Sequence, residues 1–290
     1  MTIIVADTTC SLPRELLTSR GIPFVPQVVM FGDRAYHDDG EVDTATFLEK
    51  LKASATLPKT AAPEPTLYHP IFDAARDRKE SVVVVAPSAR LSGTVRSAQT
   101  AAQDYPDLDV RVVDTQTISC NLGALVLEAH EMAQAGCSAD EIVGSVESLI
   151  PLGRLYFVVD TLEYLAKGGR IGGAKALLGE LIQIKPVLTI RNGEAQSYEQ
   201  PRTRRRSLLR LEEIVSQQCP RSAESHLAVI QVAAEDEARQ LAEHFKASMG
   251  LSEVPIYELP PAIVVHGGPG AIGVGFFVEP AAEGVKTRMV

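Results

Sequence analysis

Short apolar runs alternate with segments of helical periodicity over the first half of the chain. Runs rich in valine and isoleucine predict buried strands at residues 2–7, 22–31, 81–87 and 109–115. Apolar residues spaced three or four apart predict helices at residues 11–21, 43–54, 66–79, 94–106, 120–136 and 138–151. This alternation indicates an α/β layer in which many strands pair in parallel.

The pattern changes after about residue 150. Strands are predicted at 154–161, 226–232 and 254–260, two strand runs around Asn192-Gly193, and a strand, glycine loop and strand over 262–279. Helical patterns cover 204–218 and 235–249, and a helix, glycine loop and helix cover 162–184. Hairpins mixed with helices predict a mixed sheet. We therefore expect two α/β domains, residues 1–155 with a largely parallel sheet and residues 156–290 with a mixed one.

Composition narrows the class of protein. The chain has 290 residues, 45% hydrophobic and 22% charged, which suits an ordinary globular protein with a sizeable core. Aromatic residues make up 5% and tryptophan is missing, so a stacking platform for single-stranded nucleic acid is not indicated. The net charge of -9 argues against non-specific nucleic-acid binding.

The cysteines and the N-terminus suggest a compartment. Four cysteines lie far apart, without the spacing of a metal site, and are typical of small buried side chains in a reducing compartment. The first residues lack the basic start and apolar core of a signal peptide, and no apolar run approaches the ~18 residues of a membrane span. We expect a cytoplasmic protein without integral membrane association, metal or cofactor.

The loop between the strand at 81–87 and the next helix holds Ser88 and Ser92. The helix starting at Thr94 would present free N–H donors and partial positive charge, which suits an anion. Helix capping by Ser92 or Thr94 is the simpler interpretation. A nucleophilic serine is a third, but the G-x-S-x-G pattern of a nucleophile elbow is missing.

Three further segments carry candidate chemistry. His266 precedes a glycine-rich loop and could donate a hydrogen bond to an anionic head group. Residues 166–176 nearly match a phosphate-binding loop, but helix–turn–helix packing with an exposed Arg170 fits better. Four arginines at 201–206 precede a helix, where cations oppose the helix dipole. They form either a solvated charge run or an anion- or partner-binding patch.

Four motifs occur in an order and spacing that resemble the DegV family of bacterial lipid-binding proteins. They are LPKTAAP (57–63), SARLSGTVRSA (88–98), DTLEYLAKGGRIG (160–172) with IKPVL (184–188), and HGGPGAIGV (266–274). The resemblance covers nearly the whole chain. It implies two α/β domains with a fatty acid held between them. It also implies a role as the fatty-acid-binding subunit of a kinase, whose separate catalytic subunit makes an acyl phosphate.

The resemblance also implies roles for single residues. Thr60, Ser92 and His266 would hold the fatty-acid carboxylate, and Arg170 and Arg202 would face the kinase subunit. Three further positions would belong to the head-group loops: Ser88, Gly93 and Gly267. The chain departs from the family where Ala61 and Ala62 replace the usual Ser-Gln, where Gly267 replaces a frequent threonine, and where Asp7-Thr8-Thr9-Cys10-Ser11 replaces D-S-x-x-D.

The tail needs an apolar slot, for which the sequence offers a dense apolar series after residue 160, although plain core packing is the favoured interpretation for any single member. The series is Leu162, Leu165, Ile171, Leu177, Leu178, Leu181, Ile182 and Ile184. Two other functions stay open. One is a Ser-His hydrolase that uses Ser92 or Ser88 with His266. The other is a regulatory module that binds nucleic acid through residues 201–206.

Overall fold

The computed structural model describes residues 1–179 and 184–280. Its first half is built around a four-stranded parallel sheet in the order β2-β1-β6-β7. The strands are β1 (Thr2–Asp7), β2 (Phe24–Val25), β6 (Ser81–Ala86) and β7 (Val110–Asp114). Valine runs such as Val82–Val85 form its centre because both faces of the sheet are covered and apolar side chains are buried on each.

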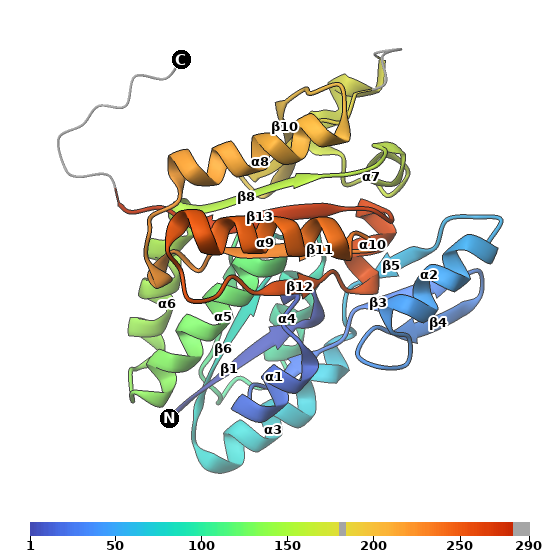
Figure 1. The fold of residues 1–290 in the computed structure, drawn as a ribbon. Coiled ribbons are helices and arrows are strands. Elements are labelled where there is room, and N and C mark those ends of the chain that lie inside the picture. The colour runs from blue at the N-terminus through green and yellow to red at the C-terminus, as the bar shows by residue number, and fades with distance from the viewer. Residues whose placement is uncertain (180–183, 281–290) are drawn as a thin grey trace.

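Helices cover this sheet on its two faces (Figure 1). One face packs against α3 (His69–Arg78) and α4 (Thr94–Ala102), through a cluster that includes Phe72 and Ala98. The opposite face packs against three helices through Leu17, Leu125 and Ile142. These are α1 (Arg14–Arg20), α5 (Ser119–Gln134) and α6 (Ala139–Leu149). The α6 helix begins with a capping box between Ser138 and Glu141.

The second half forms a six-stranded sheet in the order β10-β9-β8-β13-β11-β12. The strands are β8 (Gly153–Val158), β9 (Val187–Arg191), β10 (Glu194–Glu199), β11 (Ala228–Gln231), β12 (Ile256–Glu258) and β13 (Ile272–Phe277). All neighbours are antiparallel except β11 and β12, so the sheet is mixed. The prediction of two α/β layers, the first parallel and the second mixed, is confirmed.

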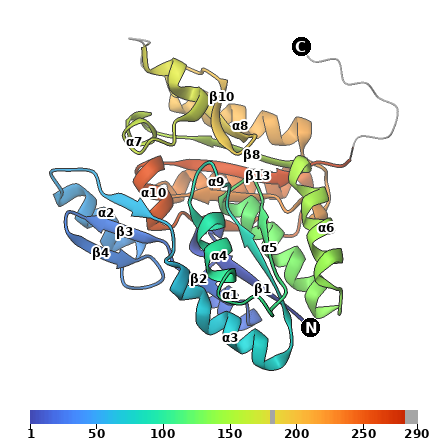
Figure 2. The ribbon, with the colours of Figure 1, turned by 180° about the vertical axis from the view of Figure 1, so that it is seen from behind.

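The two faces of the mixed sheet have different partners. One face packs on α8 (Arg204–Gln218) and α9 (Glu235–Met249) through residues such as Leu211 and Phe245. The other face turns toward the first half of the chain and toward α7 (Glu163–Lys167) and α10 (Pro261–Gly267). Figure 2 shows from behind how the two sheets lie one above the other.

A third, small sheet joins the two halves and was not predicted. Its three antiparallel strands, in the order β4-β3-β5, are β3 (Val28–Phe31), β4 (Arg34–His37) and β5 (Lys59–Ala61), with α2 (Thr44–Ala53) beside them. Val29 of β3 and Phe47 of α2 belong to the same cluster as Val264 of α10. The unit therefore comes from the first half of the sequence but packs against the second.

Three sequence predictions about elements need correction. Residues 22–31 form two strands in two sheets, because Pro26 and Gln27 interrupt the run. Residues 262–265 lie in a helix, α10, and not in a strand. The glycine segment after α7 continues as a 3₁₀-helix over Gly172–Gly179. Strand β8 spans the predicted domain boundary after residue 155, which stays a prediction.

Candidate functional site

An elongated cavity lies between the two large sheets, at the carboxyl ends of β1 and β6. The chain leaves β1 toward β2 on one side and leaves β6 toward β7 on the other, so these two strands flank the switch point of the parallel sheet. Ligands of open α/β sheets bind at such points. The cavity measures about 930 Å³ when the open space at its mouth is included.

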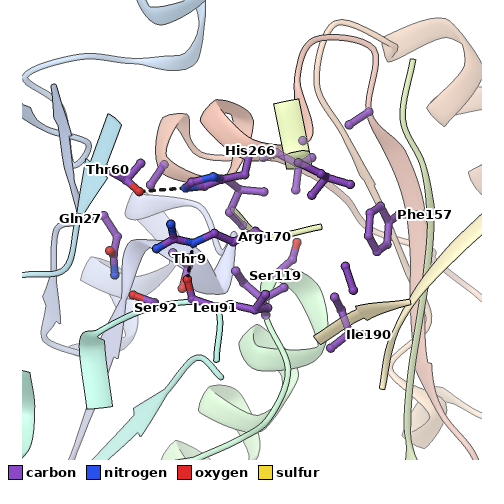
Figure 3. A pocket seen from close by; sticks show the side chains of 18 of the residues that line it. Thr9, Gln27, Thr60, Leu91, Ser92, Ser119, Phe157, Arg170, Ile190 and His266 are labelled. Carbon is purple, nitrogen blue, oxygen red and sulfur yellow. Dashed lines mark hydrogen bonds between the residues drawn. The ribbon is translucent and has the colours of Figure 1, made fainter. Parts of the chain in front are cut away.

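The cavity is polar at one end and apolar along the rest (Figure 3). Side chains from β8, β9, β11 and α10 form most of the apolar wall, and those include Leu155, Phe157, Val159, Ile190, Ile230 and Ile263. The polar end is lined by Thr9, Gln27, Thr60, Ser92, Ser119, Arg170 and His266. Among the described residues that line it, none is acidic.

Thr60 and His266 meet across this polar end. Thr60 lies in the middle of β5, and His266 lies in the last turn of α10, with Thr60 Oγ1 2.9 Å from His266 Nε2. Burial, with a smaller effect of Arg170, lowers the pKa of His266 to about 4. The imidazole is therefore neutral at pH 7.

The surroundings of Nδ1, the second ring nitrogen of His266, indicate which nitrogen carries the proton. Nδ1 is buried without a hydrogen-bond partner among the described residues and faces Gly168, where a Cβ atom would collide with it. Buried N–H groups without a partner are rarer than unpaired acceptors. We therefore assign the proton to Nε2, which donates to Thr60 Oγ1 and leaves the threonine proton for a ligand.

Ser92 lies in the loop before α4 and also lines the polar end. Its Oγ is 2.8 Å from Thr94 Oγ1 and accepts a hydrogen bond from the Thr94 N–H at 3.3 Å. The capping interpretation thus holds for one contact of Ser92, while its place on the cavity wall leaves the ligand-binding prediction open.

The other predicted head-group residues divide between the cavity and its surroundings. Gly93 and Gly267 line the cavity, together with Ala61 and Ala62. Ser88 is fully buried outside this lining, and its hydroxyl donates to the carbonyl of Gly193 at 2.8 Å. Its hydroxyl joins the loop to the β9–β10 hairpin, so Ser88 lies in a contact between the two halves of the chain.

Arg170 is half-buried, whereas the sequence predicted an exposed side chain. Its Nε donates to the Leu91 carbonyl at 3.0 Å and its Nη1 to the Gly168 carbonyl at 2.8 Å. The guanidinium is held at the mouth by backbone carbonyls because Gly168 and Gly169 turn the chain sharply after α7.

A second hollow, about 700 Å³ when the open space at its mouth is included, continues outward from the polar end and shares Thr60, Arg170 and His266 with it. The outer hollow adds Lys59 and Lys167 to its lining and, within the described residues, contains no acidic side chain. This is notable on a chain with a net charge of -9. Lys167 is paired with Glu163, so Lys59 and Arg170 make the approach to the polar end cationic.

Arg202 is exposed just before α8 and does not line either hollow. In the same basic segment, Arg204 donates from Nη1 to Asp160 at 2.8 Å and from Nε to Glu237 at 2.9 Å. These acidic partners offset the cost of cations at a helix N-terminus. The segment is thus partly structural.

The predicted apolar series contributes less to the cavity than expected. Of its described members, Leu165 lines the cavity. Leu162, Ile171, Leu177 and Ile184 belong to the surrounding core cluster, as the packing interpretation predicted. Leu181 and Ile182 lie outside the described residues, as does the side chain of Leu178. The wall comes from the mixed sheet because its strands present every second side chain to that face.

Sequence reasoning missed Thr9 and Gln27, which are buried polar residues of the cavity wall. A signal was available for Gln27, because it is the one polar residue between Ile22 and Phe31. Across residues 1–179 and 184–280, no three histidine, cysteine, aspartate or glutamate side chains are placed to share a metal ion. None of the described helices has the length and apolar character to cross a membrane.

Comparison with known proteins places these features in a family context. A profile of the DegV family, described as uncharacterised proteins, matches residues 1–279. A DegV domain-containing protein from Deinococcus radiodurans is 34% identical over 271 residues, 93% of this chain and 96% of that protein. One from Streptomyces coelicolor is 37% identical, again over 93% of this chain and 96% of its own length.

Solved structures extend the similarity to the fold. A DegV family protein from Thermus thermophilus, described by its fatty acid binding, is 31% identical with a TM-score of 0.85, over 96% of this chain and 99% of that one. DegV from Bacillus subtilis, described as a fatty acid binding protein, is 28% identical with a TM-score of 0.85 over the same shares.

Proposed function

Because the chain belongs to the DegV family, we propose that it binds a long-chain fatty acid in the cavity between its sheets. The observation that carries the proposal is the division of this cavity into one polar end and a long apolar wall. Burial of the tail contributes about 0.8 kcal/mol per CH₂ group, from which the cost of immobilising the ligand is subtracted. The tail therefore supplies most of the binding free energy, and the head-group site mainly needs to provide hydrogen-bond donors for the buried carboxylate.

We assign the carboxylate to Thr60, Ser92 and His266. A buried carboxylate without donors would be very costly. Thr60 has a free proton once Nε2 of His266 donates to it, and Ser92 lies on the same side of the cavity (Figure 3). His266 is neutral, so it holds Thr60 in place without neutralising the ligand. The carboxylate then keeps its charge and its nucleophilic oxygen.

We further propose that a separate kinase subunit phosphorylates the bound acid. The outer hollow supports this, because Lys59 and Arg170 form a cationic approach that suits the phosphates of a nucleotide carried by a partner. Lys167 also lines the hollow and is paired with Glu163. A carboxylate oxygen at the inner end of that approach would attack the terminal phosphate of a nucleoside triphosphate, and the nucleoside diphosphate would leave. Arg170 and Arg202 stay the predicted partner face.

Mass spectrometry of the purified protein tests fatty-acid binding. The native mass should exceed the chain mass by that of one fatty acid, and organic extraction should release it and identify its length. A delipidated protein that takes up no fatty acid from solution would contradict the proposal. Ser92→Ala should bind more weakly than Ser92→Thr, which keeps a hydroxyl group.

Reconstitution with the kinase subunit tests the partner face. Arg202→Ala should lower the rate of acyl phosphate formation while fatty-acid affinity stays at the wild-type value, because Arg202 lies outside both hollows. Arg221→Ala, which removes an exposed arginine after α8, is a matched control and should change neither. Equal rates for Arg202→Ala and the wild type would remove Arg202 from the partner face.

The geometry disfavours the Ser-His hydrolase. His266 Nε2 contacts Thr60, and Ser92 Oγ contacts Thr94, so the pair lacks the nucleophile–base hydrogen bond of such enzymes. The nitrogen that an acidic residue would orient, Nδ1, has no partner among the described residues. Ester turnover that disappears in Ser92→Ala would restore this alternative.

A further inference from the structure

A buried carboxyl group lies directly behind the head-group end of the cavity. Asp7 ends β1 and is 1% exposed. Its Oδ1 accepts hydrogen bonds from the backbone and hydroxyl of Thr9, at 3.0 and 2.6 Å. Its Oδ2 accepts one from Gln27 Nε2 at 2.6 Å and lies 3.2 Å from Thr94 Oγ1. All these partners are uncharged, so no cation among them holds this carboxyl in its ionised form.

Thr94 connects this carboxyl to Ser92. Its hydroxyl is fully buried and contacts three groups: Gln27 Nε2 at 2.8 Å, Ser92 Oγ at 2.8 Å and Asp7 Oδ2. A threonine hydroxyl has one proton and two lone pairs, and an amide nitrogen only donates. Gln27 therefore occupies one lone pair. The proton and the second lone pair are divided between Asp7 and Ser92, which allows two arrangements.

In the first arrangement Asp7 is ionised. Thr94 donates its proton to Asp7 Oδ2, so Ser92 must donate to Thr94 and presents only lone pairs to the cavity. Such lone pairs repel a ligand carboxylate. In the second arrangement Asp7 carries a proton on Oδ2 and donates it to Thr94. Thr94 then donates to Ser92, whose own proton is free to point at a ligand carboxylate.

We infer that a fatty-acid carboxylate bound at Ser92 draws one proton from solvent onto Asp7 through the Thr94 hydroxyl. This inference rests on the proposed function and deepens it. Asp7 is a positioning residue, because it touches no ligand and acts through the direction of two hydroxyl groups. One anion enters and one proton enters with it, so the net charge of the buried site does not change.

The titratable groups around Asp7 support this assignment. Burial raises the pKa of Asp7 to about 6, against hydrogen bonds from Thr9, Gln27 and Thr94 that lower it. Cys10 and Tyr68 face Asp7, and burial raises both of their pKa values, so both are neutral near pH 7. His266, with its lowered pKa, is neutral as well.

Asp38 is the one competing acid among the groups that face Asp7. Burial raises its pKa to about 7, with a smaller contribution from Asp7. Its Oδ1 accepts from Thr8 Oγ1 at 2.7 Å and from the Gln27 N–H at 2.9 Å, and it has no hydrogen bond to Thr94 or Ser92. Protonation of Asp38 therefore cannot turn the Ser92 hydroxyl, which makes Asp38 a matched control.

Calorimetry with delipidated protein and dodecanoate, below its micelle concentration, tests the inference. At pH 7.5, titrations in buffers of different ionisation enthalpy should show uptake of about one proton per ligand. Asp7 is ionised above a pKa of about 6 and must be protonated in the complex. Affinity should therefore fall up to about tenfold per pH unit above pH 7 and level off below pH 6. Asp7→Asn and Thr94→Val should lose the uptake, and Asp38→Asn should keep it.

Four results would overturn the inference. The first is binding to the wild type without proton uptake, a measurement that depends on no variant. The second is uptake that persists in both Asp7→Asn and Thr94→Val, and the third is uptake lost only in Asp38→Asn. The fourth is a ¹³C carboxyl shift showing that the bound acid itself is neutral. If the wild type binds no fatty acid at any pH, the proposed function fails first, and this inference with it.

Discussion

At the scale of single residues, one contact links two segments that lie 206 positions apart in the chain. Thr60 Oγ1 and His266 Nε2 are 2.9 Å apart, with the histidine neutral and its other nitrogen against Gly168. The threonine acts as acceptor for the histidine and as donor for the ligand. Each role needs the hydroxyl group, and neither needs the methyl group.

Thr60→Val should therefore weaken fatty-acid binding by about 10- to 100-fold. The change keeps the shape of the side chain but leaves the Nε2 proton of His266 without its acceptor and removes one donor to the ligand carboxylate, at about 1–3 kcal/mol for an unsatisfied buried group. Competition against a fluorescent fatty acid measures the affinity. Thr60→Ser should bind like the wild type. Equal affinity of Thr60→Val and Thr60→Ser would contradict the role of the hydroxyl.

The sequence indicated part of this arrangement and not the rest. The resemblance pointed to Thr60 and His266, and the structure brings them together. It could not indicate that Nδ1 lacks a partner, because that depends on how closely Gly168 approaches from α7. Asp7 was visible as the end of a strand. Its link to Ser92 through Thr94 depends on strand order, which local patterns do not contain.

At the scale of elements, the two halves of the molecule contact each other where α5 meets β13. Gly275 of β13 has no side chain, and Cys120 and Asn121 of α5 occupy the space. The Asn121 amide donates to the Arg154 carbonyl at 3.2 Å and reaches the Phe276 carbonyl at 3.5 Å. The start of α5 is thereby fixed to β8 and β13, and Ser119 is placed on the cavity wall.

Gly275→Ala should destabilise the protein by about 1–3 kcal/mol, because a Cβ atom there overlaps Asn121 and Cys120 and forces them to move. Gly144→Ala is the matched control. Nothing lies within 4 Å of its new Cβ, and alanine favours the α6 helix by about 0.5–1 kcal/mol. Denaturant unfolding should show the two variants moving in opposite directions. An unchanged free energy of unfolding in Gly275→Ala would mean that α5 does not pack closely against β13.

Elements with local signals were predicted correctly, and those decided by packing were not. The hairpin at Asn192-Gly193 is confirmed, with φ angles of 52° and 78°. The α10 helix was predicted as a strand because Ile263, Val264 and Val265 are β-branched. It forms a helix that starts after Pro260, and burial of Val264 and Val265 against the small sheet overrides propensity.

At the scale of the whole molecule, the cavity wall comes from three sheets at once. The parallel sheet supplies the loop with Ser92, the small sheet supplies Thr60, and the mixed sheet supplies most of the apolar side chains. The small sheet could not be predicted as a joining unit, because its strands carry no signal of which half they pack against. A ligand in this cavity contacts all three.

Removal of the bound lipid should therefore lower the melting temperature of the whole protein in one cooperative transition. A ligand that binds only the folded state stabilises it by about 2.7 kcal/mol at a concentration 100 times its dissociation constant. Differential scanning calorimetry of loaded and delipidated protein measures the shift, and readdition of the extracted acid should reverse it. Identical melting curves would show that the cavity does not hold the lipid.

Strand β8 faces two different environments along its length. Leu155 and Phe157 of β8, and Val159 directly after it, face the cavity, while Tyr156 and Val158 face the core beneath α8 and α9. The alternation follows from the strand period of two. Neighbouring residues of this segment thus have different roles. Substitutions at the odd-numbered positions can change the shape of the cavity, while the even-numbered positions keep the packing of the core. Related chains can therefore differ in the ligand they bind and keep the same fold.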